Sequence, residues 1–297
     1  MSVDVLLQQL INALSLGSIY ALLALGLAMV YGTLGILNFA YGELITIAGY
    51  TMFFASEAGL PFVAMAALGI VAAGTASVVM QLVVFRPLRG ATFVTLLFAS
   101  FALSQVLQGL FRQAISPRSM GIPTPDLFSD FVQVGDLRVG LLALITLGVA
   151  LLAMSLLFFF MRGSRAGLHM RAAALDLTTA RLLGVRTSRV IPLAFLVSGL
   201  LAGVAGVLWI ARTTSVNPGT GFTPILVAFV ATVLGGLGSV PGAVIGAFVF
   251  GALEVLLQAY LPSSIVPFQF ALALVAVAVV LYVRPEGLLG RRVEVKV

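Results

Sequence analysis

The run VGLLALITLGVALLAMSLLFFFM, residues 139–161, decides the fold class of this chain. It contains no charged side chain, and it reaches the length of about 20 apolar residues that an α-helix needs to cross a bilayer. Similar runs recur along the chain, which is 61% hydrophobic and 9% charged. Soluble domains are roughly 45–50% apolar and about 25% charged. The sequence therefore predicts an all-α, polytopic membrane protein, a helical bundle of about 8–10 transmembrane helices.

Hydropathy and turn residues divide the chain into nine membrane segments. They fall near residues 6–31, 36–55, 61–84, 91–113, 139–161, 190–211, 222–237, 241–260 and 267–283. The segment at 222–237 is short and ends in glycines, so it is either a span or a re-entrant helix. We expect residues 1–297 to form a single transmembrane domain.

The loop RGSRAGLHMRAAALDLTTARLLGVRTSRV, residues 162–190, follows the opening run directly and holds six of the fifteen arginines. Together with the loop at 85–90 and the C-terminal end, it gives one side of the membrane twelve of the sixteen Lys and Arg residues. By the positive-inside rule this side is the cytoplasm. We therefore expect a cytoplasmic C-terminus, an external N-terminus and an external loop at 114–138.

Short helices are expected within the basic loop. Met170 to Leu183 contains strong helix formers and no glycine or proline, and Gly184 suits a C-cap. Pro192 suits the first turn of the next span. Two interpretations remain open, an amphipathic helix on lipid headgroups or a coupling helix that docks on a cytoplasmic motor.

Missing residue types exclude several functions. The chain has no cysteine and one histidine, His169, which excludes thiolate chemistry and a histidine-rich metal site. Its only lysine is Lys296, whereas a Walker A loop needs a lysine after its glycines. We predict no enzymatic activity and no cofactor in this chain, and we interpret the net charge of +6 as membrane topology.

Glycine and polar residues interrupt two apolar regions, residues 31–43 and residues 233–242, which include Gly236. Broken helices in opposite halves of a transporter typically mark the transport pathway. Glycines also recur as G-x-x-x-G, at 199/203 and at 238/242/246. This spacing indicates close helix packing, either within the chain or at an interface with another subunit.

Ionisable and amide side chains within spans are costly and therefore need a partner or a pathway. The candidates for a translocation pathway are Asn38, Glu43, Ser104, Gln108, Gly236 and Glu254. Glu43 falls near the expected cytoplasmic end of its span, where a snorkelling carboxylate is the alternative. Glu254 falls nearer mid-span, and this position predicts that its side chain lies inside the bundle, either in packing or in the pathway. Ser104 and Gln108 continue a stripe from Ser100 that lines a cavity or bonds to a neighbouring helix.

Four ordered stretches resemble the permeases of branched-chain amino acid ABC importers of the LivH type. The first is GSIYALLALGL at 17–27 with LNFAYGEL at 37–44. The second runs from Arg171 and Asp176 through Ala180 and Gly184 to SGLLAGVAG at 198–206. The third is LGGLGSVPGA at 234–243, and the fourth is RPEGLLG at 284–290. Their order and spacing extend the resemblance over nearly the whole chain.

The resemblance implies a type II importer-like bundle in a bacterial inner membrane. Its partners would be a second, related permease subunit, two cytoplasmic ABC ATPase subunits that hydrolyse ATP, and an extracytoplasmic substrate-binding protein. The loop at 162–190 would be the ATPase-coupling segment, through Arg171, Asp176, Ala180, Arg181 and Gly184. Only Ala180 and Gly184 match the E-A-A-x-x-x-G coupling motif of other importers.

The function that the resemblance implies is import of branched-chain amino acids by alternating access. The alternatives are an ABC permease for other amino acids, amides or urea, and an ATP-independent secondary transporter or channel. No residue in the sequence distinguishes a zwitterionic amino acid from a neutral amide, so the sequence does not identify the substrate.

Overall fold

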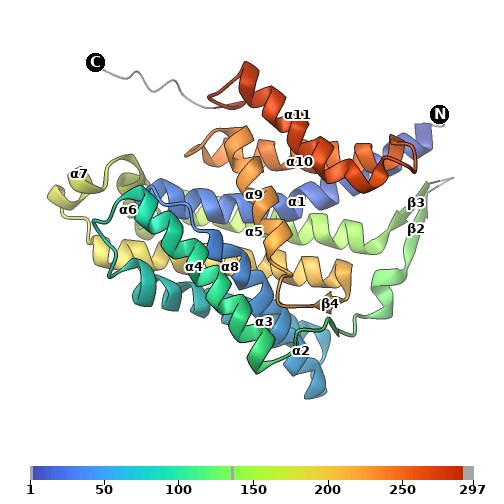
Figure 1. Ribbon diagram of the computed structural model, residues 1–297, viewed down its shortest axis with the longest axis horizontal. Coiled ribbons are helices and arrows are strands. Elements are labelled where there is room, and N and C mark those ends of the chain that lie inside the picture. The colour runs from blue at the N-terminus through green and yellow to red at the C-terminus, as the bar shows by residue number, and fades with distance from the viewer. Residues whose placement is uncertain (1–2, 135–136, 290–297) are drawn as a thin grey trace.

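The computed structural model describes residues 3–134 and 137–289, and these residues form a bundle of helices with two small β-ribbons (Figure 1). The helices are α1 (Val3–Leu34), α2 (Glu43–Glu57), α3 (Phe62–Met80), α4 (Phe93–Ala114), α5 (Leu141–Gly163), α6 (Arg165–Leu175), α7 (Leu177–Leu182), α8 (Thr187–Thr213), α9 (Phe222–Gly235), α10 (Val240–Tyr260) and α11 (Gln269–Val283). A 3-10 turn, Phe39–Gly42, precedes α2, and a π-helical turn, Gln81–Phe85, extends α3.

Nine of these helices match the nine predicted membrane segments one to one. Within the described residues, seven helical segments are long and apolar enough to cross a membrane. The other two, α2 and α9, have 15 and 14 residues. About 20 residues are needed to span a bilayer, so α2 and α9 each cross only part of it. The segments that precede them, residues 35–42 and 214–221, are not α-helical.

The bundle has two ends of different chemistry. Helices α6 and α7 lie at one end, and the strands β2 and β3 lie at the other (Figure 1). We call the first end, with α6, α7 and the turn at 86–90, the basic face. The second end is the strand face, where β1 (Met120–Gly121) pairs with β4 (Ser215–Val216) and β2 (Phe131–Val134) with β3 (Leu137–Gly140), both antiparallel.

Helix α1 is the centre of the bundle, with 94% of its most apolar window buried. It packs against α10 at Gly17 and Gly251, where a Cβ built on Gly251 would lie 2.6 Å from the Cα of Gly17. Such contact requires glycine, because any side chain would separate the two backbones. By contrast, only 11% of the corresponding window of α11 is buried, so most of its apolar side chains are exposed on the outside of the chain.

The G-x-x-x-G spacings pack helices of the same chain. Gly199 and Gly203 of α8 lie against α3, where a Cβ on Gly199 would meet Ser77 at 2.4 Å. Gly242 and Gly246 of α10 lie against α9. Of the two interpretations of these glycines, intrachain packing is the one confirmed.

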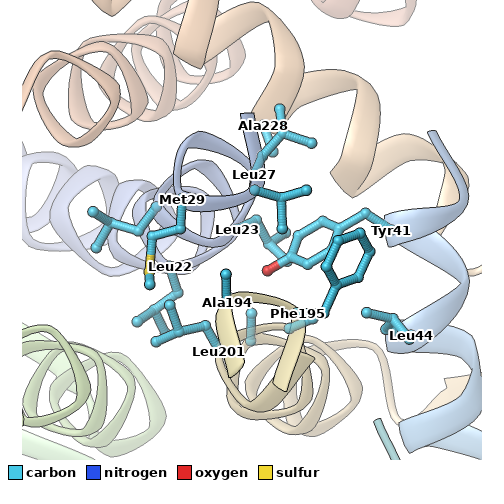
Figure 2. Close-up of a cluster of buried hydrophobic side chains, with 14 of the residues drawn as sticks. Leu22, Leu23, Leu27, Met29, Tyr41, Leu44, Ala194, Phe195, Leu201 and Ala228 are labelled. Atoms are coloured by element: carbon cyan, nitrogen blue, oxygen red, sulfur yellow. The ribbon is translucent and has the colours of Figure 1, made fainter. Parts of the chain in front are cut away.

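A large core joins α1, α2 and α8. Figure 2 shows Tyr41 pointing between α1 and α8, beside Phe195 and Leu27. The Tyr41 hydroxyl donates to the Ser198 carbonyl at 2.9 Å, and the Ser198 hydroxyl donates to the Gly26 carbonyl at 2.9 Å. This chain of bonds satisfies the two buried hydroxyls and fixes the segment before α2 against the bundle.

The basic loop contains two short helices, as expected, and they meet at Asp176, which ends α6 and caps α7. It differs from expectation at one point. The next span begins at Thr187, so that Pro192 lies inside α8 and not in its first turn. The Asp176 side chain accepts from the Thr178 N–H and so caps α7. Gly184 has a φ of +86°, as a glycine after a helix C-terminus does.

Candidate functional site

Helix α4 turns one polar stripe inward. Its buried residues are Leu96, Ser100, Ser104 and Gln108. Ser104 is half-way along α4, roughly 16 Å from the helix start at a rise of about 1.5 Å per residue. Whatever bonds to Ser104 therefore lies deep within the bilayer.

The partner of this stripe is Glu43, the first residue of α2. Its Oε1 accepts hydrogen bonds from the Ser104 hydroxyl at 2.7 Å and from Gln108 Nε2 at 2.8 Å. Glu43 is only 1% exposed. The snorkelling interpretation is therefore wrong for Glu43, because the chain re-enters the bundle after α1 and carries this residue to mid-depth. We expected the stripe either to line a cavity or to bond to a neighbouring helix, and it makes hydrogen bonds to a neighbouring helix.

Helices α2 and α9 begin at the same point. The Gly221 N–H donates to the Thr46 hydroxyl at 3.1 Å, and a Cβ on Gly221 would lie 1.8 Å from the carbonyl oxygen of Gly42. From this contact α2 runs to the strand face and α9 to the basic face. We call the two first turns, Gly42–Thr46 and Gly221–Ile225, the helix junction.

The second interruption predicted from the sequence is not part of the junction. Gly236, with a φ of +108°, lies in the turn between α9 and α10. This turn is at the basic face, where the Leu288 N–H donates to the Leu234 carbonyl at 2.7 Å. The break that faces residues 35–42 is instead the segment 217–221, because only Gly221 approaches Gly42 closely enough to share its backbone space.

Two acceptor atoms near the junction have no hydrogen-bond partner among the described residues. They are Oδ1 of Asn38 and Oε2 of Glu43, and both side chains are buried. Asn38 also lines a narrow cleft between the 3-10 turn and α9, with Phe39, Ile225 and Phe229. Buried acceptors without partners are rare and require an explanation, such as a donor that binds transiently.

Glu254 belongs to a different contact. Its Oε2 accepts a hydrogen bond from the Tyr20 hydroxyl at 2.9 Å, which joins α10 to α1. Of the six pathway candidates, the structure brings Asn38, Glu43, Ser104 and Gln108 to one region and leaves Gly236 and Glu254 outside it. Thr46 and Gly221 were missed by sequence reasoning, although the Asn217-Pro218-Gly219 turn signal marked the break that contains them.

The candidate coupling residues mostly build the basic loop. Arg171 donates to the Met161 carbonyl, and the Arg181 Nε donates to Thr187 at 3.1 Å. Asp176 accepts from the Thr178 N–H at 2.9 Å and from the Thr179 hydroxyl. These bonds, first the one from Thr179, hold the pKa of Asp176 below its usual value.

Exposed leucines dominate the tip of the basic loop. Leu175, Leu182 and Leu183 are 89%, 84% and 79% exposed, whereas Ala180 is 2% exposed. We call these three leucines the leucine tip. The leucine tip was not among the residues predicted from the sequence, although leucines in a polar loop with helix signals are themselves a signal of a docking surface.

The sequence matches the family described as branched-chain amino acid transport system permease component over residues 9–293. The chain is 37% identical to the high-affinity branched-chain amino acid transport system permease protein LivH of Escherichia coli K12, covering 96% of each chain. It is 34% identical to the permease protein BraD of Pseudomonas aeruginosa, again covering 96% of each.

This chain belongs to that permease family. It is a multi-pass membrane protein, and its ABC system carries the ATPase on a separate subunit. Among solved structures, PsaBC from Streptococcus pneumoniae in complex with Fab superposes with a TM-score of 0.49 at 16% identity, covering 93% of this chain and 91% of that chain. No cluster of metal-ligating side chains occurs within residues 3–134 and 137–289.

Proposed function

We propose that this permease imports branched-chain amino acids by alternating access, with the solute passing the helix junction. The observation that carries the proposal is the meeting of two partial helices at mid-depth beside a buried carboxylate. Non-helical backbone at this depth is tolerated only within protein or along a water-filled cavity. The relatives at 37% and 34% identity are named as branched-chain amino acid permeases, which supports the substrate class.

The first turn of α9 indicates which side of the junction faces the pathway. Phe222 is 43% exposed, and Thr223 is exposed beside it. Helix N-terminal N–H groups exposed to lipid would lack hydrogen-bond partners. We infer that this side faces the second permease subunit across the pathway. In the first turn of α9 the Phe222 N–H donates to the Gly219 carbonyl and Pro224 has no N–H, so the Thr223 N–H is the donor left for a substrate carboxylate. The free acceptors of Asn38 and Glu43 suit an ammonium group.

The basic face is cytoplasmic in this proposal, and so is the C-terminus, in accord with the charge distribution of the loops. Two ATPase subunits, one for each permease of the pair, bind there, and an extracytoplasmic binding protein docks at the strand face. The leucine tip inserts into a cleft of the ATPase, while Arg171, Asp176, Ala180, Arg181 and Gly184 hold the shape of the loop behind it.

Solvent labelling tests the position of the pathway. The chain has no cysteine, so single cysteines can be introduced without background. We expect Thr223→Cys to react with a membrane-impermeant maleimide, and substrate with binding protein and ATP to change the rate. Leu152→Cys is the matched control, since Leu152 is 60% exposed near the middle of α5, a helix that does not form the helix junction. Equal reactivity at the two positions would show that the pathway does not pass the first turn of α9.

Reconstitution tests the function itself. Proteoliposomes containing both permeases and both ATPases should accumulate labelled leucine only with ATP and binding protein. Flux through this chain alone would contradict the proposal and favour a secondary transporter or channel. Leu182→Asp and Leu183→Asp should abolish the accumulation while leaving the protein folded, whereas normal uptake in both variants would refute docking through the leucine tip.

A further inference from the structure

A second pocket lies at the basic face, apart from the helix junction, and encloses about 190 Å³. We call it the arginine pocket, because Arg89 and Arg181 both line it. Its walls come from the end of α1, the π-helical turn, the start of α4, and helices α7 and α8. The lining residues are Leu34, Ile36, Gln81, Phe85, Arg89, Gly90, Ala91, Leu96, Leu177, Arg181 and Ile191.

The two arginines lack a counter-charge in the pocket, since none of its described lining residues is acidic. The pKa of Arg89 is lowered, first by burial and then by repulsion from Arg86 and Arg181. Guanidinium groups brought together in this way favour an oxyanion, which they bind through paired N–H donors.

Gln81 supplies the second observation. Its side chain is 0% exposed, and neither Oε1 nor Nε2 has a hydrogen-bond partner among the described residues. A buried amide without partners costs free energy unless a bound group satisfies both its acceptor and its donor. Gln81 also begins the π-helical turn, a geometry that occurs frequently at functional sites.

The rest of the pocket is aliphatic. Leu34, Ile36, Leu96 and Ile191 supply apolar wall around the polar groups. A ligand that satisfies all three features has an oxyanion that accepts from the arginines and from Gln81 Nε2, an N–H donor for Gln81 Oε1, and a small aliphatic body. A zwitterionic aliphatic amino acid has these groups, whereas inorganic phosphate has no aliphatic body.

We propose that the arginine pocket binds a branched-chain amino acid from the basic face and that its occupancy slows import. This inference rests on the proposed function for the identity of the solute and for the cytoplasmic position of the pocket. A carboxylate held between Arg89 and Arg181 connects the turn before α4 to α7, the helix that ends at the leucine tip. Such a bridge restrains α7 against the bundle, so the ATPase cannot move it as freely.

Direct binding is the first test, with labelled leucine and the permease pair in nanodiscs without ATPase or binding protein. We expect Arg89→Gln and Gln81→Leu each to weaken binding about tenfold, the loss expected when a charged or buried hydrogen-bonding partner is removed. Arg86→Gln removes a charge from the same turn but does not line the pocket, and it should leave binding nearly unchanged. Equal weakening in all three variants, or in none, would overturn the proposal.

Uptake is the second test, in ATP-loaded proteoliposomes of the whole transporter with or without leucine inside. Internal leucine should slow wild-type uptake, and the ratio of the two rates should approach one in Arg89→Gln and Gln81→Leu. If uptake proceeds but internal leucine never slows it, the pocket proposal fails and the proposed function stands. Displacement of bound leucine by inorganic phosphate, or loss of binding in nanodiscs of anionic lipid, would assign the pocket to phosphate groups and overturn the amino-acid proposal.

Discussion

Glu43 and Ser104 are 61 positions apart in the chain, yet a 2.7 Å hydrogen bond joins them at mid-depth in the bundle. The bond connects the first residue of a partial helix to the centre of α4. It thereby fixes the depth at which the 3-10 turn passes into α2. Gln108 adds a second bond to the same carboxylate oxygen, so three side chains share one buried site.

Removing the Glu43 acceptor should destabilise the protein. Glu43→Leu leaves the donors of Ser104 and Gln108 without a partner, which costs about 1–3 kcal/mol. Glu43→Gln keeps an oxygen acceptor and should lose less. Unfolding by denaturing detergent in mixed micelles measures the difference. Equal stability of the two variants would show that Ser104 and Gln108 find other partners.

The contact between Gly42 and Gly221 predicts a steric effect. In Gly221→Ala the new Cβ would lie 1.8 Å from the Gly42 carbonyl oxygen, so α2 and α9 must separate. Overpacking of a core typically costs about 1–3 kcal/mol, and backbone on both sides leaves no soft neighbour to move. Monodisperse yield after solubilisation measures the effect. Gly109→Ala is the control, because its Cβ would meet nothing within 4 Å and should be tolerated.

The cap of α7 should depend on pH. Because the pKa of Asp176 is lowered in the folded protein, its stabilising effect is fully present above the unfolded value of about 3.9 and is lost as the pH falls through the folded value. Hydrogen exchange of the α7 amides should therefore be slow at neutral pH, after correction for intrinsic rates, and faster in strong acid. Asp176→Asn still caps the helix, so its protection should not change with pH in this range.

The bond between Tyr20 and Glu254 predicts coupling between α1 and α10. Tyr20→Phe should cost about 0.5–1.5 kcal/mol, as loss of one hydrogen bond does. Glu254→Gln keeps an acceptor and should be milder than Glu254→Lys, which places a cation beside Arg212. A double-mutant cycle of Tyr20→Phe with Glu254→Leu should be non-additive. Simple additivity would mean that the bond contributes nothing to stability.

Much of the fold follows from local sequence. The apolar runs gave the nine membrane segments, and the placement of arginine and lysine gave the two chemically distinct faces. The stripe of Ser104 and Gln108 could be recognised because helix periodicity alone places both on one side of α4. The packing of Gly199 and Gly203 was one of two open interpretations, and only the contact with α3 decided between them.

The depth of Glu43 could not be predicted in the same way. A hydropathy profile reports how apolar a segment is, but not whether the chain crosses as a full helix or as extended backbone followed by a short one. For the same reason the sequence does not show that the 233–242 interruption is a turn at the basic face, whereas the first break lies within the bundle. A turn at the membrane surface and a break within the membrane use the same residues, glycine and proline.

The sequence by itself determined that this protein is a helical membrane permease, because hydrophobic length, charge asymmetry and family motifs are properties of short segments. The tertiary structure alone decided which breaks meet, which glycines touch and which polar atoms are left without partners. Those facts depend on contacts between residues far apart in the chain, such as Gly42 with Gly221 and Gln81 with its pocket. They are set by how backbones approach one another, which no local pattern records.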